Sequence, residues 1–282
     1  MKNNMFKKAF FCSFLIISCP YVHSEQQVTR LTSDGPNNGH SAYDLIRKFA
    51  GPRSIESPDL YPDNHPGVLH IFEDTDEEVG HHFVFVLHRD VDKDRDKYIK
   101  FNDRQRNEIK AYSKSKKALK AYEGETLKYK WKFKLPSDMS LSNNFSHFFQ
   151  LKSVDDGVGQ PIFTFSGRSY KNQKWFALSH AGVQKASIIA KKPWQNISEV
   201  WLEAECKVTY SNEGKLEVTI KRLDQQEVLI HFESENIDMW RGTDKRHFVR
   251  PKWGYYRSLK SKSMLANEKD SIRFADFEVI KY

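Results

Sequence analysis

Cysteine is scarce in this chain of 282 residues. Three cysteines occur, and two of them, Cys12 and Cys19, lie within the first 24 residues. If that segment is removed, Cys206 is alone, and no intramolecular disulfide can form unless Cys19 is retained. Cys206 lies in Val200–Tyr210 (VWLEAECKVTY), which has the pattern of a strand. We therefore predict a buried, unreactive thiol at this position.

Long apolar runs are lacking beyond the beginning of the chain. Ala9–Cys19 (AFFCSFLIISC) is apolar and follows three lysines, but it is too short to span a bilayer comfortably. We predict a signal peptide over residues 1–24, cleaved after Ser24, and hence a secreted or periplasmic protein. Ile16–Cys19 (IISC) offers a second interpretation, a lipoprotein signal with Cys19 as the lipidated residue. No later run is apolar enough to suggest a membrane span.

Neither sign of charge dominates. The chain carries 45 basic and 37 acidic residues, a formal net charge of +8. Three of the lysines and none of the acids lie in the first 24 residues, so the remainder carries +5. A modest positive balance favours polyanionic partners. It is too small to indicate nucleic acid, and the predicted export also argues against nucleic acid as a partner.

Internal repeats and low-complexity linkers are absent, which favours one domain. Residues 25–63 are polar and include a helical stretch at Ala42–Ala50, so we predict an N-terminal arm packed on a domain of residues 64–282. A second helical candidate is Ser113–Ala121. The remainder is rich in runs that alternate with period two and contain aromatic or β-branched residues. These runs are His81–His88, Thr126–Leu135, His147–Ser153, Pro161–Ser166, Lys174–Ser179, Val200–Tyr210, Lys215–Leu223, Glu227–Glu233, Lys252–Ser258 and Ser271–Lys281. Many strands at short spacing predict a β-sandwich or jelly roll.

One further strand, Asp103–Lys110 (DRQRNEIK), is unusually rich in charge. Its alternation places on one face Arg104, Arg106, Glu108 and Lys110. Four charged side chains cannot all point into an apolar core. This face is therefore either a solvated charge ladder or the floor of a polar groove.

Two other strands also carry polar faces. In Phe148–Lys152 (FFQLK), Gln150 and Lys152 share a face. In Arg250–Arg257 (RPKWGYYR), one face carries Arg250, Lys252, Gly254 and Tyr256. A glycine between a lysine and a tyrosine predicts room for a ligand to lie against the sheet.

Together these three segments resemble the motif set of the jelly-roll polysaccharide lyases, the group that includes alginate, glucuronan and heparin lyases. Arg106–Lys110 (RNEIK) is similar to the R-S-E-L-R motif of alginate lyases with that fold, and Gln150–Lys152 (QLK) is similar to Q-I-H. Lys252–Arg257 (KWGYYR) preserves the K-x-G-x-Y spacing of Y-F-K-A-G-V-Y-N-Q. The motifs occur in the family's order. One departure is that Lys152 stands where the family has histidine.

The resemblance implies a fold and a reaction. The fold is a concanavalin-A-like β-jelly roll, with two packed antiparallel sheets and a few short helices. The reaction is β-elimination in an acidic polysaccharide that contains uronic acid. Removal of the C5 proton and expulsion of the C4 oxygen leave a 4,5-unsaturated uronate end. No other partner is implied, and a monomer is expected.

The resemblance also implies roles for individual residues. Arg106 and Gln150 would neutralise the uronate carboxylate, with Lys152 as a third group, and Lys252 would complete the catalytic set. Tyr256 would be the general acid, and also the base if no separate base exists. The nearby cations are expected to lower its pKa. Substrate contacts are assigned to Arg104, Glu108, Lys110, Lys152, Arg250 and Arg257.

A separate base would be His147, the histidine nearest in sequence to Gln150. Alternation sets His147 on the opposite face from Gln150 unless a bulge intervenes. Other candidates lie on an early strand, at His81, His82 and His88. Each of these residues taken singly has an ordinary structural explanation. The functional interpretation depends on three polar-faced strands, a basic balance and export occurring in one chain.

Two other classes of protein stay open. A glycoside hydrolase needs two carboxylates that flank the scissile bond. The acid cluster Glu199, Glu203 and Glu205 lacks the E-x-D-x-x-E pattern of hydrolases with a similar shape. A non-catalytic module that binds acidic glycans would use the same basic groove.

No cofactor or metal is expected. The acids Asp90, Asp92, Asp94 and Asp96 alternate as in a calcium loop. Arg95 and Phe101 stand where an EF-hand requires glycine and glutamate, so an EF-hand is excluded. Two interpretations of these four residues stay open, a looser calcium site and a solvated loop tip.

Overall fold

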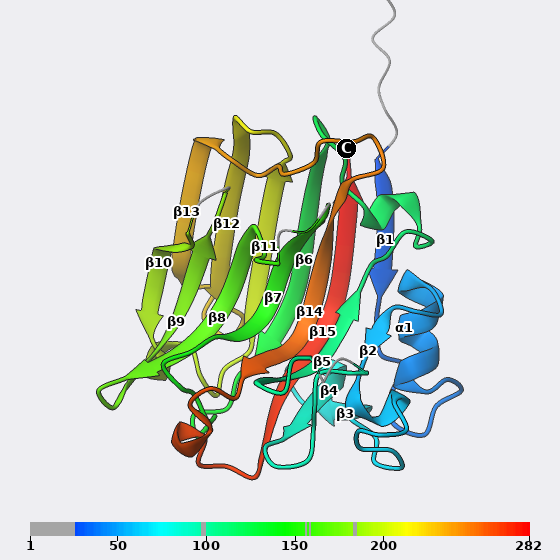
Figure 1. Ribbon diagram of the computed structural model, residues 1–282, viewed down its shortest axis with the longest axis vertical. Coiled ribbons are helices and arrows are strands. Elements are labelled where there is room, and N and C mark those ends of the chain that lie inside the picture. The colour runs from blue at the N-terminus through cyan, green and yellow to red at the C-terminus, as the bar shows by residue number, and fades with distance from the viewer. Residues whose placement is uncertain (1–25, 97–99, 156, 158, 183–184) are drawn as a thin grey trace, which may run out of the picture.

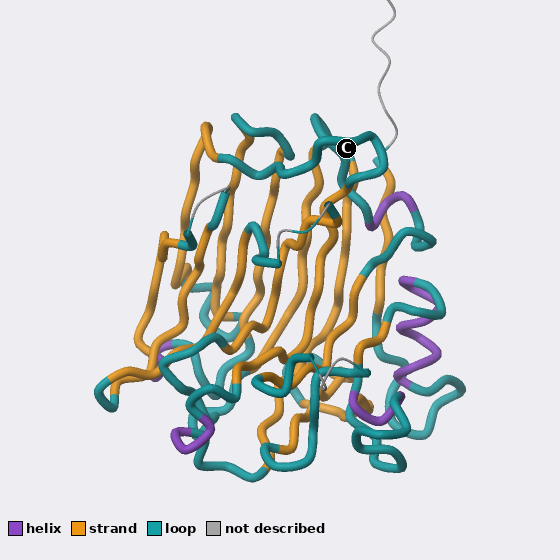
Figure 2. Tube along the Cα trace, viewed as in Figure 1, coloured by secondary structure: helices purple, strands orange, loops and turns teal. Residues whose placement is uncertain are grey.

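The computed structural model describes residues 26–282, apart from 97–99, 156, 158 and 183–184. The predicted signal segment, with Ser24 and Cys19, lies outside the described residues. Within them, two antiparallel sheets overlie one another, and helices are few and short (Figures 1 and 2). The predicted all-β jelly roll is confirmed.

One sheet has eight strands in the described part of the chain. Its order is β13 (Val228–Ile237), β12 (Gly214–Arg222), β11 (Leu202–Thr209), β6 (Thr126–Lys134), β15 (Lys269–Lys281), β4 (Gly80–His88) and β3 (Ile71–Asp76), with β1 (Gln27–Leu31) paired to β15. Neighbouring strands such as β6 and β15 are far apart in sequence, as a jelly roll requires.

The other sheet has seven strands among the described residues. Its order is β10 (Ser187–Pro193), β9 (Gln173–His180), β8 (Phe163–Tyr170), β7 (Ser146–Val154), β14 (Phe248–Ser258), β5 (Arg104–Lys110) and β2 (Ile55–Glu56). The three strands with predicted polar faces, β7, β14 and β5, are neighbours at the centre of this sheet. Their outer face, turned away from the eight-stranded sheet, carries the candidate site.

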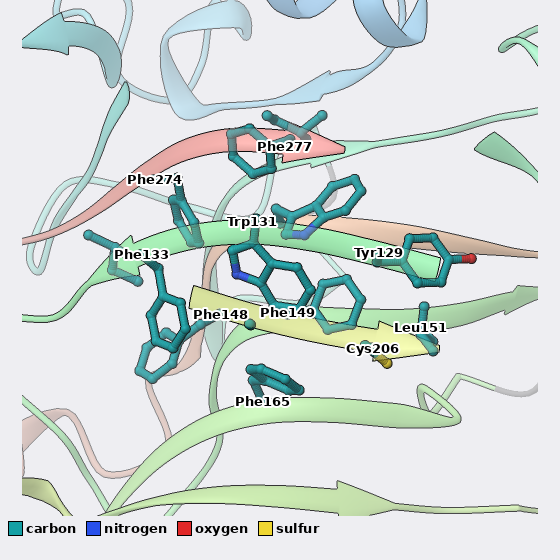
Figure 3. Close-up of a cluster of buried hydrophobic side chains, with 14 of the residues drawn as sticks. Tyr129, Trp131, Phe133, Phe148, Phe149, Leu151, Phe165, Cys206, Phe274 and Phe277 are labelled. Atoms are coloured by element: carbon teal, nitrogen blue, oxygen red, sulfur yellow. The ribbon is translucent and has the colours of Figure 1, made fainter. Parts of the chain in front are cut away.

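The core lies between the sheets and is dominated by aromatic rings. Strand β6 shows the cause: its apolar residues alternate with lysines, and Trp131 points inward. The ring of Trp131 packs against the tilted rings of Phe149 and Phe165, and the ring centroids are 4.4 and 5.2 Å apart (Figure 3). Cys206 lies in the same buried cluster, as predicted, and burial raises the pKa of its thiol. Burial of such large side chains is the main stabilising contribution in a sandwich of this kind.

The N-terminal segment is integrated into both sheets. Strand β1 pairs with β15, and β2 pairs with β5. Between them lies α1 (Ala42–Ala50), which is capped by Ser41, whose side chain accepts a hydrogen bond from the Asp44 amide. The helix presents Ile46 and Phe49 to the core. Segment 25–63 therefore contributes structure to the sheet that carries the candidate site.

Several helices and strands differ from those that the sequence predicted. Ser113–Ala121 forms only a 3-10 turn at Lys117–Leu119 rather than a helix. Strands β1, β2, β3 and β10 were not predicted, because most are short edge strands with few buried apolar residues and little alternation. The remaining 3-10 turns are Pro58–Leu60, Trp194–Asn196 and Lys262–Met264.

Two β-bulges reshape the centre of the seven-stranded sheet. The pairing of β7 with β8 shifts between His147 and Phe149, so Phe148 and Phe149 both face the core. His147 consequently lies on the same outer face as Gln150, and the bulge reverses the expectation from simple alternation.

The second bulge explains Gly254. The pairing of β14 with β7 shifts between Trp253 and Tyr256, and Gly254 has φ +141°. A Cβ atom there would lie 2.2 Å from the Asn107 carbonyl oxygen of β5. The glycine is thus required by the close approach of two backbones, which corrects the expectation that it makes room for a ligand.

No helix in the described ranges is both long and apolar enough to cross a membrane.

Candidate active site

The strand register brings the predicted polar residues together. Across β14 and β5, Tyr256 is opposite Arg106 and Lys252 is opposite Lys110. Across β14 and β7, Lys252 is opposite Gln150 and Tyr256 is opposite His147. Three neighbouring strands therefore display these side chains on one face of the sheet, as alternation predicted for all of them except His147, which the bulge in β7 brings to this face.

Glu108 is the centre of this face and is only 1% exposed. Its carboxylate accepts hydrogen bonds from Arg106 at 2.5 Å and from the Gln150 amide. The ammonium group of Lys252 lies 2.6 Å away. A carboxylate so enclosed by donors of its own chain has little capacity left for a glycan. Glu108 therefore holds the site together instead of forming the predicted substrate contact.

Glu56 is a second buried anion, supplied by β2. Its carboxylate pairs with Lys252 at 2.7 Å, with Lys110 at 2.6 Å and with the guanidinium of Arg95. These cations hold the pKa of Glu56 well below its ordinary value, although burial opposes them. Burial, together with Arg106, lowers the pKa of Lys252 to about 8. Sequence reasoning missed Glu56 because β2 is only two residues long.

Arg106 is already paired within the protein. It donates to Asp94 at 2.8 Å and to Glu108 at 2.5 Å. Its guanidinium carbon lies 3.6 Å from the ring centroid of Tyr256. Glu56 lies 3.5 Å from the same guanidinium, so three carboxylates balance its charge. Arg106 is therefore better suited to support the Tyr256 ring than to neutralise a substrate.

Tyr256 lies over this network and is 8% exposed. Its hydroxyl oxygen accepts a hydrogen bond from Arg104 at 3.1 Å. Burial raises the pKa of Tyr256 and outweighs the opposing influence of Arg106 and Arg104. The expectation that nearby cations lower the pKa of Tyr256 is therefore wrong. The hydroxyl is protonated at neutral pH, as a general acid requires.

His147 is beside Tyr256, with ring centroids 5.9 Å apart. Its Nδ1 lies 2.7 Å from the Ser166 hydroxyl, which in turn donates to Thr164 at 3.2 Å. The Ser166 oxygen therefore accepts from the His147 Nδ1–H, and Nε2 is left unprotonated. Burial and the positive charge of Arg168 lower the pKa of His147 to about 3. A neutral imidazole next to a protonated phenol is a base–acid pair.

Arg168 is the second residue that sequence reasoning missed. It lines a cavity of about 240 Å³ together with Arg104, His147 and Tyr256. Among the residues that the structure describes, no carboxylate pairs with Arg168, and its buried Nε has no hydrogen-bond partner. An available signal was the alternation of Thr164, Ser166 and Arg168 along β8, which marks a fourth polar-faced strand.

Two other predicted cations extend the positive surface along the sheet. Arg250 and Lys152 are opposite one another on β14 and β7. Arg250 donates to the Ala111 carbonyl at 2.9 Å, and Lys152 donates to the Ser153 carbonyl at 3.0 Å. Both are partly exposed, so their placement is compatible with substrate contact.

Arg257 is placed differently from the prediction. It lies on the opposite face of β14 from Tyr256, is 0% exposed, and pairs with Asp270 at 2.5 Å. It also donates to Gln105 at 2.8 Å. A residue enclosed between the sheets cannot contact a polysaccharide, and Arg257 instead supports the core.

The early-strand histidines do not join the cavity. His81 contacts Thr75, and the ring of His82 packs against Trp201 at 5.3 Å. His88 belongs to a separate cluster with Asp92, at the end of β4. Among the histidine candidates, the structure brings only His147 to Tyr256 within the described residues.

The alternating acids of the predicted calcium loop engage different partners. Asp90 pairs with Arg89 and Lys262. Asp94 pairs with Arg95 and Arg106, whereas Asp92 contacts three histidines. Asp96 is exposed. The four carboxylates are thus directed to separate sets of groups.

The acid cluster that would serve a hydrolase lies elsewhere. Glu203 is on β11 of the other sheet and pairs with Lys130 at 3.1 Å and Lys221 at 3.0 Å. Glu205 pairs with Lys128, and Glu199 accepts a hydrogen bond from the Ser137 amide. Glu203 and Glu205 are thus held in ion pairs and Glu199 in a backbone hydrogen bond, and none of the three lines the cavity of Arg168 and His147.

Comparison with solved structures places this fold among polysaccharide lyases. The alginate lyase Aly36B is similar with a TM-score of 0.59 and 8% identity, covering 89% of this chain and 96% of that chain. The PL-14 alginate lyase from Aplysia kurodai has a TM-score of 0.55 and 10% identity, with 89% and 97% covered. The endo-β-1,4-glucuronan lyase from Trichoderma reesei has a TM-score of 0.50 and 10% identity, with 80% and 93% covered.

The predicted resemblance to jelly-roll polysaccharide lyases is thereby confirmed at the level of the fold. No protein-family model and no curated protein sequence matches the chain. At identities near 10%, a shared fold does not assign a substrate. A substrate can be proposed only from the chemistry of the cavity.

Proposed function

We propose that this protein is a polysaccharide lyase that cleaves a uronate-containing acidic polysaccharide by β-elimination. The observation that carries the proposal is one cavity lined by a neutral histidine, a protonated tyrosine and an arginine without a carboxylate partner in the described chain. These groups match the three needs of the reaction, which are a base, an acid and a counter-charge for the uronate.

The proposed elimination assigns one task to each group. Arg168 binds the uronate carboxylate and stabilises the negative charge that develops when C5 loses its proton. Nε2 of His147 takes that proton, and the electron pair forms the C4–C5 double bond. The C4–O bond breaks, and the Tyr256 hydroxyl supplies the proton to the leaving oxygen. The products are a 4,5-unsaturated uronate end and a free hydroxyl end.

Substrate binding also alters the base. In the free protein, Arg168 is one cause of the low pKa of His147. A uronate carboxylate on Arg168 neutralises that charge, so the pKa of His147 rises when substrate is present. The base is thus strengthened in the complex, where it is needed.

The remaining charged residues position the acid. Arg106 supports the Tyr256 ring, and it is held by Glu108 and Asp94. Gln150 and Lys252 complete the hydrogen bonds of Glu108. In this proposal Arg106, Gln150 and Lys252 act through their neighbours, whereas the resemblance had implied direct substrate contact for Arg106 and Gln150.

The proposed substrate is an acidic glycan that lies along the outer face of the seven-stranded sheet. Lys152 and Arg250 extend the positive surface from the cavity, and Arg104 lies beside Tyr256. We further propose that the protein acts outside the cytoplasm, as its basic balance and predicted export suggest, and that it does so as a monomer.

The experiment is absorbance of the unsaturated uronate while purified protein meets alginate, glucuronan and glycosaminoglycans in turn. We expect a rise with at least one polymer. It should be lost in Tyr256→Phe and His147→Gln, and reduced about 10²–10³-fold in Arg168→Gln. The matched controls are Tyr282→Phe and His231→Gln, because both residues are exposed and belong to the side of the eight-stranded sheet, where Tyr282 follows β15 and His231 lies on β13.

Two outcomes would contradict the proposal. If no polymer gives a rise but one still binds, the same basic surface serves a non-catalytic glycan-binding protein. If His147→Gln and Arg168→Gln are as active as the unaltered protein, the assigned base and counter-charge are wrong.

A further inference from the structure

Four side chains outside the candidate active site converge on one point. They are His65, His70, His88 and Asp92. Two come from the segment that precedes β3, one from the end of β4 and one from the loop that follows β4. One ligand atom from each lies within 4.8 Å of all the others. His70 and Asp92 are buried, and the other two are partly exposed.

The distances between these atoms approach those of a tetrahedral coordination shell. With metal–nitrogen distances of about 2.0–2.1 Å, the ligand atoms of a tetrahedral zinc site lie about 3.3–3.4 Å apart. His88 Nδ1 lies 3.3 Å from His70 Nε2 and 3.3 Å from Asp92 Oδ2. Asp92 Oδ1 lies 2.9 Å from His70 Nε2 and 2.7 Å from His65 Nδ1. These five atoms, which include both oxygens of Asp92, are separated along the four contacts by 2.7 to 3.3 Å, close to the edge length of such a shell.

The three imidazole rings are arranged around this point in a regular way. Their centroids are separated by 5.0, 5.0 and 5.1 Å. The ring planes meet at 76°, 81° and 83°, so each ring presents an edge to the others. This spacing and edge-on orientation are compatible with three rings that share one ion at their nitrogen edges.

The surrounding hydrogen bonds fix the orientation of the ligands. His70 Nδ1 lies 2.6 Å from the Val68 carbonyl oxygen, which accepts its proton and leaves Nε2 free to coordinate. The His88 amide donates to Asp92 Oδ2 at 2.6 Å. Gln105 donates to the carbonyls of His88 and Asp92. This outer layer is of the kind that supports metal ligands.

A simple ion pair explains only part of the cluster. The ion pair of His70 with Asp92 at 2.9 Å, extended by Asp59 at 3.3 Å on the other ring nitrogen, balances one imidazolium. It does not explain why two further imidazoles direct nitrogens to the same carboxylate. A divalent cation accounts for all four groups at once.

We propose that His65, His70, His88 and Asp92 bind one divalent transition-metal ion of the zinc class. Three nitrogens and one oxygen suit such an ion, whereas calcium prefers six to eight oxygen ligands. All four positions of a tetrahedron are filled by the protein, so the site is structural.

The site also fixes the loop that reaches the candidate active site. Asp94 follows Asp92 by two residues and holds Arg106 at 2.8 Å. Asn64 precedes the ligand His65, and its side chain bonds the backbone of Lys93 and Arg95. The ion therefore joins two loops of the chain. Through Asp94 and Arg106, the ion thereby helps to position the ring of Tyr256. This consequence rests on the proposed function, but ion binding itself does not.

The test measures metal binding to the purified chain directly. After chelation and dialysis, titration with Zn²⁺ alone should show one ion per chain and a rise in the melting temperature. Co²⁺ in its place should give the intense visible absorption of tetrahedral coordination. His65→Ala removes a partly exposed ligand and should reduce affinity at least 100-fold, whereas the exposed His231→Ala should not change it.

The outcomes separate this inference from the lyase proposal, because no readout uses a polysaccharide. The metal-site proposal would be overturned if the folded, metal-depleted protein did not bind Zn²⁺. It would also be overturned by equal affinity of His65→Ala and the unaltered chain, or by stabilisation by Ca²⁺ and not by Zn²⁺. If His65→Ala fails to fold, Asp92→Asn replaces it, with loss of the cobalt absorption as the expected result.

Discussion

The residues of the outer face fall into two groups according to their partners. Arg106 and Lys252 are enclosed by carboxylates of their own chain. Arg168 has no such partner among the described residues, and it faces the same cavity as His147. A substrate carboxylate gains most from a cation that is not yet neutralised. For this reason the counter-charge is assigned to Arg168, and Arg106 is given a positioning role.

The low pKa of His147 predicts an unusual pH profile for the free protein. Because that pKa is about 3, His147 stays unprotonated well below the ordinary histidine value of about 6.5. We expect kcat/KM on a responsive polymer to change less than about twofold between pH 5.5 and 7, where an unshifted histidine base would lose about tenfold.

The profile of kcat provides the control for this prediction. It reports the complex, in which the uronate neutralises Arg168 and the pKa of His147 is higher. Its acidic limb should therefore lie at higher pH than that of kcat/KM. An inflection of kcat/KM between pH 6 and 7 would show that an ordinary histidine is the base.

At the scale of elements, the bulge in β7 brings His147 to the face that carries Tyr256, and the bulge in β14 sets the pairing of these two residues. The bulge in β14 depends on Gly254, whose φ of +141° and close contact with Asn107 exclude a side chain. We expect Gly254→Ala to lower the free energy of unfolding by about 3 kcal/mol or more. Gly124→Ala is the matched control: φ is +82° there, no atom lies within 4 Å of the added Cβ, and the expected cost is about 1 kcal/mol. Urea denaturation measures both, and equal costs would show that the bulge tolerates a Cβ.

Bulges also mark the limit of what alternation could predict. Period-two patterns located most long strands and the shared face of Arg106 and Glu108. They could not show that Phe148 and Phe149 both turn inward, because an inserted residue leaves no signature in a run of apolar letters. Glu56 escaped notice for a related reason. Its strand is two residues long, and its importance arises only from cations brought to it by β14 and β5.

At the scale of the whole molecule, buried charge joins segments that are distant in sequence. Residues 25–63 were predicted to form an arm, yet they contribute Glu56 to the outer face and His70 follows shortly after them. No local pattern links these residues to the loop after β4, so the histidine cluster could not be read from spacing. The fold class was predictable because it follows from composition and alternation. The site was only partly predictable because it depends on long-range register.

Glu56 is therefore expected to be important for stability as well as for the site. Glu56→Gln leaves Lys252, Lys110 and Arg95 without their shared anion, and breaking a buried charge network costs about 3–5 kcal/mol. The control Glu213→Gln alters an exposed glutamate and should change the free energy of unfolding by less than about 0.5 kcal/mol.

The pH dependence of this difference has a definite sign. The pKa of Glu56 is held well below its ordinary value, so its stabilising contribution is fully present above the unfolded pKa of about 4.3. The contribution is lost as the pH falls through the folded pKa. Urea denaturation at several pH values should thus show a constant gap between Glu56→Gln and the unaltered protein above pH 5, and a narrowing gap well below pH 4. A gap that widens on acidification would mean that Glu56 is protonated in the folded protein, and the network would then lack the anion that balances its cations.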